Sequence, residues 1–378
     1  MTPKQLVIVC LSLFCALFTQ AADLDLDFHP QISVLGFYNS PSNTRQKSYG
    51  QGQLSLPASL FLNEYFSLHA QYFFAYDYYN KQESFYNKLN RAVISFNADS
   101  LEVKIGRDFL DWGLKPVIYF GTYEDKDLKK PTYLDGGFAN YKLGKYIDIS
   151  LLGAKFDETD LYGAKLALGF LEGFYFISKE GTFDLENFGG ALNFENDTFA
   201  LHFLTAFNRG QKTKKILWYT YKQKYNGYLI SGDMVFKKDR KLFDTQFSVG
   251  AEYLSPNKEN AFGYRPVYAN FDKGFIFGNL NEGLETLTYK MGFNIRPNFL
   301  KDLSADIRIY NFKATNKDFI YKDIASELDL SLLYQYNKFS FKLSYGYLKS
   351  LNAFANFASG FEEKAALSKT GFLISYQF

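Results

Sequence analysis

Histidine, cysteine and clustered carboxylates are the residue types that most often build catalytic or metal sites, and this sequence offers few of them. Its histidines are His29, His69 and His202. Neither His69 nor His202 stands in a His-x-Ser or similar nucleophile arrangement, and no two histidines have the spacing of metal ligands. We therefore expect no enzyme, no metal and no other cofactor, and we expect these two histidines to be polar groups facing the interior of a sheet structure.

Charged side chains, by contrast, recur at alternate positions of apolar segments along the chain. If the apolar face of such a segment meets lipid, the opposite face lines an interior, where ionisable groups survive only beside water or beside each other. The pattern predicts pore-lining charges, with pairing between opposite charges as the alternative because the two signs are balanced. The basic candidates are Arg91, Lys104, Lys165, Lys290, Arg296, Arg308 and Lys342, and the acidic candidates are Glu102, Asp148, Asp233, Asp244, Glu252, Asp306 and Asp329.

The elements that would position these charges are antiparallel β-strands. Side chains alternate between the two faces of a strand, and residues 339–347 alternate aromatic or aliphatic with Ser, Lys or Gly without a break. About 18 such segments follow one another, most of them near the roughly 9 to 11 residues that a tilted membrane strand needs. Aromatic residues make up 19% of the chain, as suits an apolar outside and a wet inside. The sequence predicts an all-β fold, a transmembrane antiparallel β-barrel.

The stretch from Gly371 to Phe378 predicts the strand that closes this barrel. In a soluble domain, a chain ending on an apolar strand would leave an unpaired edge, whereas pairing with the first strand, about Gln31 to Tyr38, removes that edge. The pattern also resembles the insertion signal that outer-membrane barrels present to the barrel-assembly machinery. The residues of that signal, which share one face, are Phe372, Ile374, Tyr376 and Phe378.

The N-terminal segment predicts export. Lys4, an apolar run from Leu6 to Phe18 and small residues up to Ala22 form the pattern of a cleaved signal peptide over residues 1–22, which leaves residues 23–378 as one barrel. The only cysteines, Cys10 and Cys15, lie in that segment, so the mature chain has no disulfide or thiolate metal site. The balance of 42 basic and 40 acidic residues implies no nucleic-acid partner. We expect a location in the outer membrane of a Gram-negative bacterium, in contact with lipid and lipopolysaccharide.

The connections between the predicted strands give an independent indication. Every second connection is short, as at Asn63 to Tyr65 and at Asn337–Lys338, and outer-membrane barrels have short periplasmic turns and long external loops. The parity requires an even number of strands with both ends in the periplasm. The long connections are Asp108 to Asp135, Gly210 to Tyr225, Leu254 to Glu285 and Lys349 to Lys369.

The third of the predicted external loops, Asp108 to Asp135, combines apolar residues with a run of charges. An amphipathic loop of this length packs somewhere, and two placements are open. It folds into the barrel and narrows it, as a loop at this place does in general porins, or it lies over the outer rim.

A family resemblance is carried by Lys104 to Gly113, which read KIGRDFLDWG, by Leu134 to Gly137, and by a strand with Ile149 to Gly153. These residues resemble the alginate-export type of outer-membrane porin. The resemblance implies a barrel of the predicted size, and it makes Arg107 and Asp135 pore-mouth or loop-anchoring residues.

Together these features predict a porin that passively conducts small hydrophilic solutes. One alternative is a substrate-specific channel for an anionic saccharide, in which Lys290, Arg308 and Lys342 form a basic patch unless Asp329 on the intervening strand pairs with them. Another is a plugged structural or adhesive barrel, favoured if the long connections from Asp108 and from Leu254 both fill the interior. The sequence does not set the oligomeric state.

Overall fold

The computed structural model describes residues 25–40, 48–79, 82–115, 117–120, 132–181, 183–216, 219–256, 261–262, 264, 276–277, 285–316, 322–354 and 366–378. Strands and their connections account for almost all of these residues. No helix among them combines the length and the apolar character needed to cross a membrane. The predicted signal peptide at residues 1–22 lies outside the described residues, as do parts of the long connections.

The described residues form 20 strands of one sheet. In chain order they are β1 (Asp25–Phe28), β2 (Gln31–Ser40), β3 (Ser48–Phe61), β4 (Phe66–Tyr79), β5 (Gln82–Ala98), β6 (Leu101–Asp108), β7 (Leu134–Leu143), β8 (Ile147–Phe156), β9 (Thr159–Leu168), β10 (Leu171–Glu180), β11 (Phe183–Glu195), β12 (Phe199–Ile216), β13 (Tyr219–Asp239), β14 (Phe243–Leu254), β15 (Ala261–Phe262), β16 (Thr286–Pro297), β17 (Leu303–Ala314), β18 (Asp323–Tyr336), β19 (Phe339–Ser350) and β20 (Ala366–Gln377).

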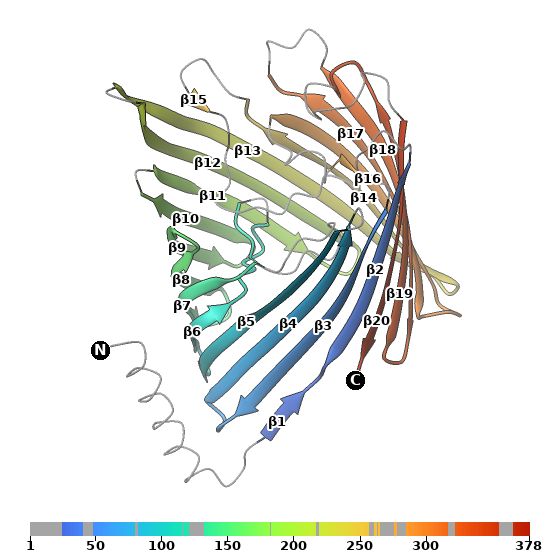
Figure 1. The fold of residues 1–378 in the computed structure, drawn as a ribbon, viewed down its shortest axis with the longest axis horizontal. Coiled ribbons are helices and arrows are strands. Elements are labelled where there is room, and N and C mark those ends of the chain that lie inside the picture. Colours follow the sequence, from blue (N-terminus) through green and yellow to red (C-terminus); the bar gives the residue numbers. More distant parts are fainter. Residues whose placement is uncertain are drawn as a thin grey trace.

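The sheet closes on itself. Each strand from β2 to β14 and from β16 to β20 pairs antiparallel with its neighbours in the sequence, and β20 pairs with β2 from Gln31↔Gln377 to Ser40↔Ser368. Figure 1 shows the blue β2 beside the red β20. With β1 and β15 outside the ring, 18 strands form a closed antiparallel barrel. The predicted fold class, strand number and closing strand are confirmed.

Two prolines explain why β1 and β2 are separate strands. β1 pairs with β3 up to Phe28↔Ala58, and β2 resumes the pairing at Gln31↔Ser55. Continuing that register places His29 opposite Pro57 and Pro30 opposite Leu56, and proline has no backbone N–H to give to a ladder. Both residue pairs at the break thus contain a proline, which cannot donate to the ladder.

The connections at one end of the ring are all short, as predicted, whereas those at the other end vary from two residues, as between Phe156 and Thr159, to the long connections after Asp108 and Leu254. Short turns at one end join the strands, for example Leu168 to Leu171 and Tyr336 to Phe339. One predicted long connection is wrong, however. The stretch Gly210 to Tyr225 continues β12 and β13 as a hairpin paired up to Ile216↔Tyr219. The sequence of this stretch is rich in Lys, Thr and Gln and does not alternate as a lipid-facing strand would.

The outward face of the ring is apolar. On β19 the outward side chains are 39% to 52% exposed, whereas the alternate residues face the interior. An apolar outer band of this kind suits hydrocarbon, which accepts no unpaired backbone group and leaves a closed barrel as the stable form of a sheet. The outward residues of β19 are Phe339, Phe341, Leu343, Tyr345 and Tyr347.

Candidate functional site

The inner face of the ring has two walls of opposite character. The covered wall, on β8 to β14, presents buried apolar side chains. The open wall, on β2 to β4 and β16 to β20, presents amides, hydroxyls and charges to a cavity. The apolar side chains of the covered wall are Leu152, Leu161, Phe174, Phe176, Ala191, Leu204, Ala206, Leu229 and Leu254.

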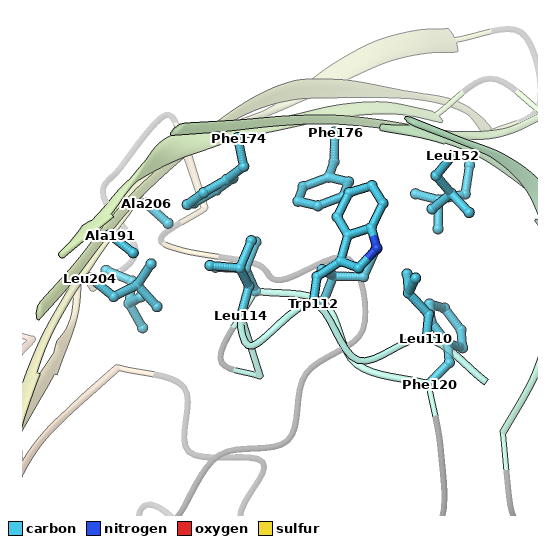
Figure 2. Packing of buried hydrophobic residues seen from close by; sticks show 14 of the residues in the cluster. Leu110, Trp112, Leu114, Phe120, Leu152, Phe174, Phe176, Ala191, Leu204 and Ala206 are labelled. Carbon is cyan, nitrogen blue, oxygen red and sulfur yellow. The ribbon is translucent and has the colours of Figure 1, made fainter. Parts of the chain in front are cut away.

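The beginning of the third external loop, which follows Asp108 and is called the third loop below, lies on the covered wall. From Asp108 the chain turns into the barrel, and its apolar side chains pack against the wall, as Figure 2 shows for Trp112 beside Phe176. The Trp112 and Phe176 ring centroids are 5.3 Å apart. Of the two placements open from the sequence, the described residues 108–115 and 117–120 therefore show the inward one. The packed loop residues are Leu110, Trp112, Leu114, Val117, Ile118 and Phe120.

Local hydrogen bonds give this loop segment its shape. The backbone N–H groups of Leu110 and Phe120 each donate to the other's carbonyl, at 2.8 and 2.9 Å, and Val117 and Ile118 both donate to the Leu114 carbonyl. Lys165 of β9 donates from Nζ to the Trp112 carbonyl at 3.1 Å. Burial of a whole aliphatic side chain stabilises a packed structure by roughly 1.5–3 kcal/mol. Burial of Leu114, Val117 and Ile118 therefore holds this loop segment against the covered wall.

A second loop reaches the interior on the other side of the ring. Ile276 and Phe277 pack against the inner faces of β17 to β20, and the Phe277 ring stacks on Phe312 at 4.0 Å. Their backbone N–H groups donate to the Glu327 carboxylate at 2.5 and 2.9 Å. Glu327 is only 2% exposed, so these donors satisfy a carboxylate that has left water.

Tyr264, in the same connection, is buried within the apolar cluster of the covered wall. Burial raises the pKa of its hydroxyl, and the nearby Glu252 carboxylate adds to that rise. This side chain therefore stays neutral at physiological pH.

The open wall borders a cavity of about 800 Å³. It lies toward the short turns, since Asn337 and Lys338 of the turn between β18 and β19 line it. Most of the other lining side chains are uncharged and polar. They include Gln31, Ser33, Gln51, Gln53, Ser55, Gln71, Asn294, Ser304, Ser331, Gln335, Ser340, Ser375 and Gln377.

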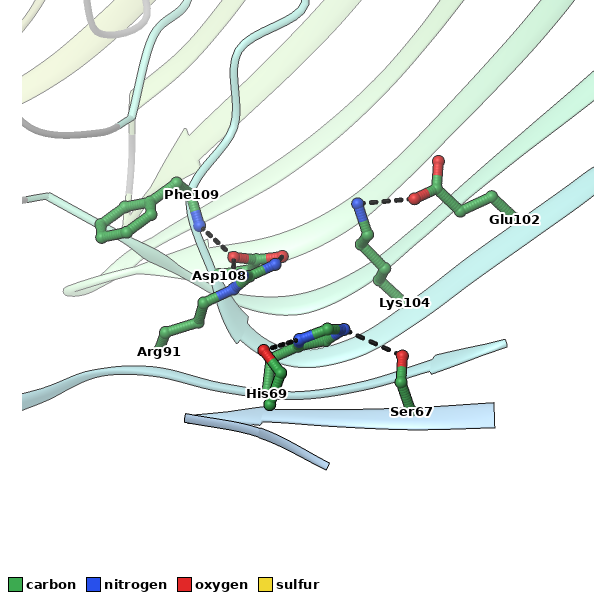
Figure 3. A network of polar contacts seen from close by, with 8 residues as sticks. Ser67, His69, Arg91, Glu102, Lys104, Asp108 and Phe109 are labelled. Carbon is green, nitrogen blue, oxygen red and sulfur yellow. Dashed lines mark hydrogen bonds and ion pairs between the residues drawn. The ribbon is translucent and has the colours of Figure 1, made fainter. Parts of the chain in front are cut away.

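Two of the predicted lumen cations lie side by side on the inner face of β5 and β6. Arg91 binds Asp108 through Nε–Oδ1 at 2.7 Å and Nη2–Oδ2 at 3.3 Å. Lys104 lies 2.6 Å from Glu102 on the same strand. Figure 3 shows both pairs above His69. The charges on this part of the inner face are therefore paired, which was the alternative considered from the sequence.

Pairing continues on the other side of the interior. Lys290 of β16 lies 2.9 Å from Asp233 of β13, and Arg308 binds Asp306 on its own strand at 3.0 and 3.2 Å. Asp329 is the direct cross-strand neighbour of Arg308. The predicted basic patch of Lys290, Arg308 and Lys342 is thus interspersed with carboxylates.

The remaining inward cations lie toward the short turns. Lys342 of β19 lines the open-wall cavity together with Arg308. Arg296 lies at the end of β16 and donates from Nε to the Lys301 carbonyl at 2.9 Å. Lys165 lies 3.5 Å from Glu172 under the third loop.

Arg107 and Asp135 take one of the two roles that the resemblance implied, that of loop-anchoring residues. The alternation places Arg107 on the face of Ile105, which is 63% exposed on the outside of the barrel. Arg107 binds Asp135 at 2.7 and 2.9 Å and donates to the Leu89 carbonyl. Its guanidinium also lies 4.2 Å from the Tyr133 ring centroid. The pair anchors the start and end of the third loop on the outer face and does not line the pore.

Arg107 and Asp135 begin a row of alternating charges along the outer face. The row crosses β6 to β11, and each member is the direct cross-strand neighbour of the next. Opposite charges in such positions stabilise a sheet by roughly 0.2–1 kcal/mol per pair. The row consists of Arg107, Asp135, Lys155, Asp160, Lys179 and Asp184.

The histidines on the inner face are held by uncharged partners. His69 lies 2.8 Å from Ser59 Oγ and 2.9 Å from Ser67 Oγ through its two ring nitrogens. His202 lies 3.1 Å from Asn193 Oδ1. Among the described residues, no three His, Cys, Asp or Glu side chains gather as metal ligands would.

Sequence reasoning missed the apolar character of the covered wall. A signal for it was present in β10, where Phe174 and Phe176 point inward while Tyr175 points outward. A strand that is apolar on both faces is covered on both faces.

No protein-family model matches the chain, and no curated protein matches it. Several solved structures are similar to the chain. OccK1 (OpdK) of Pseudomonas aeruginosa has a TM-score of 0.62 at 10% identity, covering 94% of this chain and 98% of that one. OccK5 (OpdH) of P. aeruginosa has a TM-score of 0.61 at 12% identity, covering 94% and 98%.

The outer membrane protein OprD of the same organism has a TM-score of 0.59 at 10% identity, covering 95% of both chains. At these identities the likeness concerns the fold. The chain has the fold of outer-membrane porins.

Proposed function

We propose that the protein is an outer-membrane porin through which small hydrophilic solutes diffuse passively. The observation that carries this proposal is the open wall, where polar side chains from strands at both ends of the chain border a cavity of about 800 Å³. Barrels of 16–18 strands are wide enough to leave an aqueous channel. The protein would contact lipid and lipopolysaccharide through its apolar outer face, and its role would be transport and not catalysis.

The test is single-channel conductance of the refolded mature protein in a planar bilayer. We expect discrete open levels in symmetric salt. A protein that shows the faster gel mobility of a folded barrel before boiling, yet conducts nothing, would contradict the proposal. That result would favour the plugged structural barrel instead.

A channel specific for an anionic solute is the second candidate. Arg308 and Lys342 line the cavity of the open wall, and the similar protein OpdK was solved with vanillate. Residues 104–113 resemble alginate-export porins, and by that resemblance the anion would be a saccharide. A reversal potential of the anion-selective sign in a salt gradient would favour this candidate.

Export and insertion complete the proposal. Residues 1–22 would direct export and be cleaved, and the strand ending at Phe378 would be read by the barrel-assembly machinery. Phe372 and Ile374 are 47% and 39% exposed on the outer face of β20, where the barrel-assembly machinery could contact them. Removal of Phe378 should lower the amount of folded barrel in the outer membrane, measured by gel mobility.

A further inference from the structure

A second, smaller cavity lies beneath the third loop. Its volume is about 150 Å³, and it is bordered by the start of the loop and the inner faces of β5 to β8. A volume of about this size is enough for a benzene ring. The lining residues are Val93, Lys104, Gly106, Asp108, Phe109, Leu110, Asp111, Trp112, Leu134, Gly136, Gly137, Phe138, Leu152 and Ala154.

Glycines in the strands beside the cavity let neighbouring backbones approach closely. Gly106 has φ +133°, and a Cβ there would lie 2.2 Å from the Ala92 carbonyl oxygen. At Gly136 a Cβ would lie 2.3 Å from the Gly153 carbonyl oxygen. Neither position accepts a side chain, so the strands come together closely while the loop crosses above them.

Two aromatic rings, one from the loop and one from β7, also border the cavity. The Trp112 and Phe138 centroids are 5.9 Å apart with their planes at 53°. A flat aromatic guest can meet such rings edge to face or in offset stacks, an arrangement worth about 0.5–1.5 kcal/mol beyond buried area.

One polar group of the cavity lacks a partner. Trp112 is 7% exposed, and among the described residues its buried indole Nε1 has no hydrogen-bond acceptor. Figure 2 shows this nitrogen on the side of the ring that faces Leu110 and Leu152, both of which line the cavity. Because an unpaired buried donor is costly, an acceptor on the guest would be favourable there.

The charges around the cavity balance. Lys104 lies against Glu102, Asp108 binds Arg91, and Asp111 lies 3.8 Å from Lys115. A guest anion would have to compete with Glu102 for Lys104 while lying near the Asp108 and Asp111 carboxylates. The cavity therefore favours a guest without net charge.

We propose that this cavity binds a small, flat, uncharged aromatic molecule whose hydrogen-bond acceptor takes the Trp112 indole N–H. The proposal rests on the porin function and names a solute class for it. Such a molecule would be retained on its way through the channel, next to the third loop.

Intrinsic fluorescence offers a direct test, because the chain has 2 tryptophans. Trp218→Phe leaves Trp112 as the only one. Titration of this variant, refolded in detergent, with benzamide should give a saturable fluorescence change. Benzoate and cyclohexanecarboxamide should need at least about tenfold higher concentrations, a difference of about 1.4 kcal/mol.

A matched pair of substitutions locates the binding. Ala154→Leu fills the cavity from its wall and should abolish the saturable change. Ala164→Leu makes the same change on the neighbouring strand β9, on the face of the exposed Tyr162 and Leu166, and should leave it intact. An equal response to all three compounds, stronger binding of benzoate, or an unaltered response in Ala154→Leu would overturn the proposal.

The outcome is separable from that of the conductance measurement. A conducting channel without saturable benzamide binding refutes only the cavity proposal. Saturable binding to a barrel that does not conduct refutes only the porin function.

Discussion

The covered wall and the open wall are built by the same alternation of side chains, yet one is apolar and the other polar. On β10 the inward residues Phe174 and Phe176 are 6% and 0% exposed beneath the third loop. On β18 the inward residues Ser331 and Gln335 face the cavity. The difference shows that the inner face of this barrel is polar where water reaches it and apolar where a loop lies on it.

The comparison also shows how the interior of the barrel is narrowed. The loop is held by burial of its apolar side chains, with Lys165 and a few backbone bonds fixing its position. A loop attached in this way can be released by changing the wall alone, without altering the loop sequence.

A charge placed in the covered wall should have the largest effect. Phe176→Asp would leave an uncompensated carboxylate against Trp112, and a buried unpaired charge costs roughly 3–5 kcal/mol, which shifts the docking equilibrium more than about a hundredfold. The loop should leave the wall and single-channel conductance should rise. Ser331→Asp on the open wall is the control and should alter conductance far less. A folded Phe176→Asp barrel with the original conductance would show that the loop does not restrict the path.

The rate at which single cysteines are labelled should differ between the two walls, and this is the second largest effect that we expect. With the predicted signal peptide removed, the chain has no cysteine, so single substitutions can be read directly. Ser331→Cys should react with a charged maleimide about a hundredfold faster than Leu161→Cys, because labelling of the covered wall waits for a local opening of about 3 kcal/mol. Leu161 is 1% exposed. Similar labelling rates would mean that the loop is not seated on the wall.

Removal of one charge from the open wall should have the smallest effect. Lys342→Gln should change the permeability ratio toward cations about twofold, since a unit charge several ångströms away through water is worth roughly 0.5 kcal/mol. The reversal potential in a salt gradient measures this shift. Arg107→Gln removes a cation from the outer face and should leave the potential unchanged. A shift in that control would place Arg107 on the conduction path.

Much of the barrel could be predicted from period-2 alternation alone. It gave the lipid-facing residues of β19, the pairing of β20 with β2, and the inward direction of Arg91 and Lys104. Arg107 could have been placed as well, because it lies three residues after Lys104 and so on the opposite face of β6. The resemblance left both the pore mouth and the loop anchor open for Arg107, and the parity would have decided between them.

The covered wall was harder to predict for a physical reason. Its burial depends on contacts between Leu110 to Phe120 and strands far away in the sequence, and alternation within one strand carries no information on such contacts. Only the double-sided apolar character of β10 pointed to a cover. The extension of β12 and β13 past Gly210 was missed because strands in water need no apolar face.

The seam between β2 and β20 has a consequence for the order of assembly. Gln31 and Gln377 are paired although they lie near the two ends of the described chain. The ladder of hydrogen bonds that closes the ring therefore joins a strand that is synthesised early to one that is synthesised last. Until that ladder forms, both terminal strands expose unpaired edges that invite pairing with other chains. Contacts of such wide sequence separation form slowly. The interval before closure is therefore when this protein depends most on being shielded from its own copies.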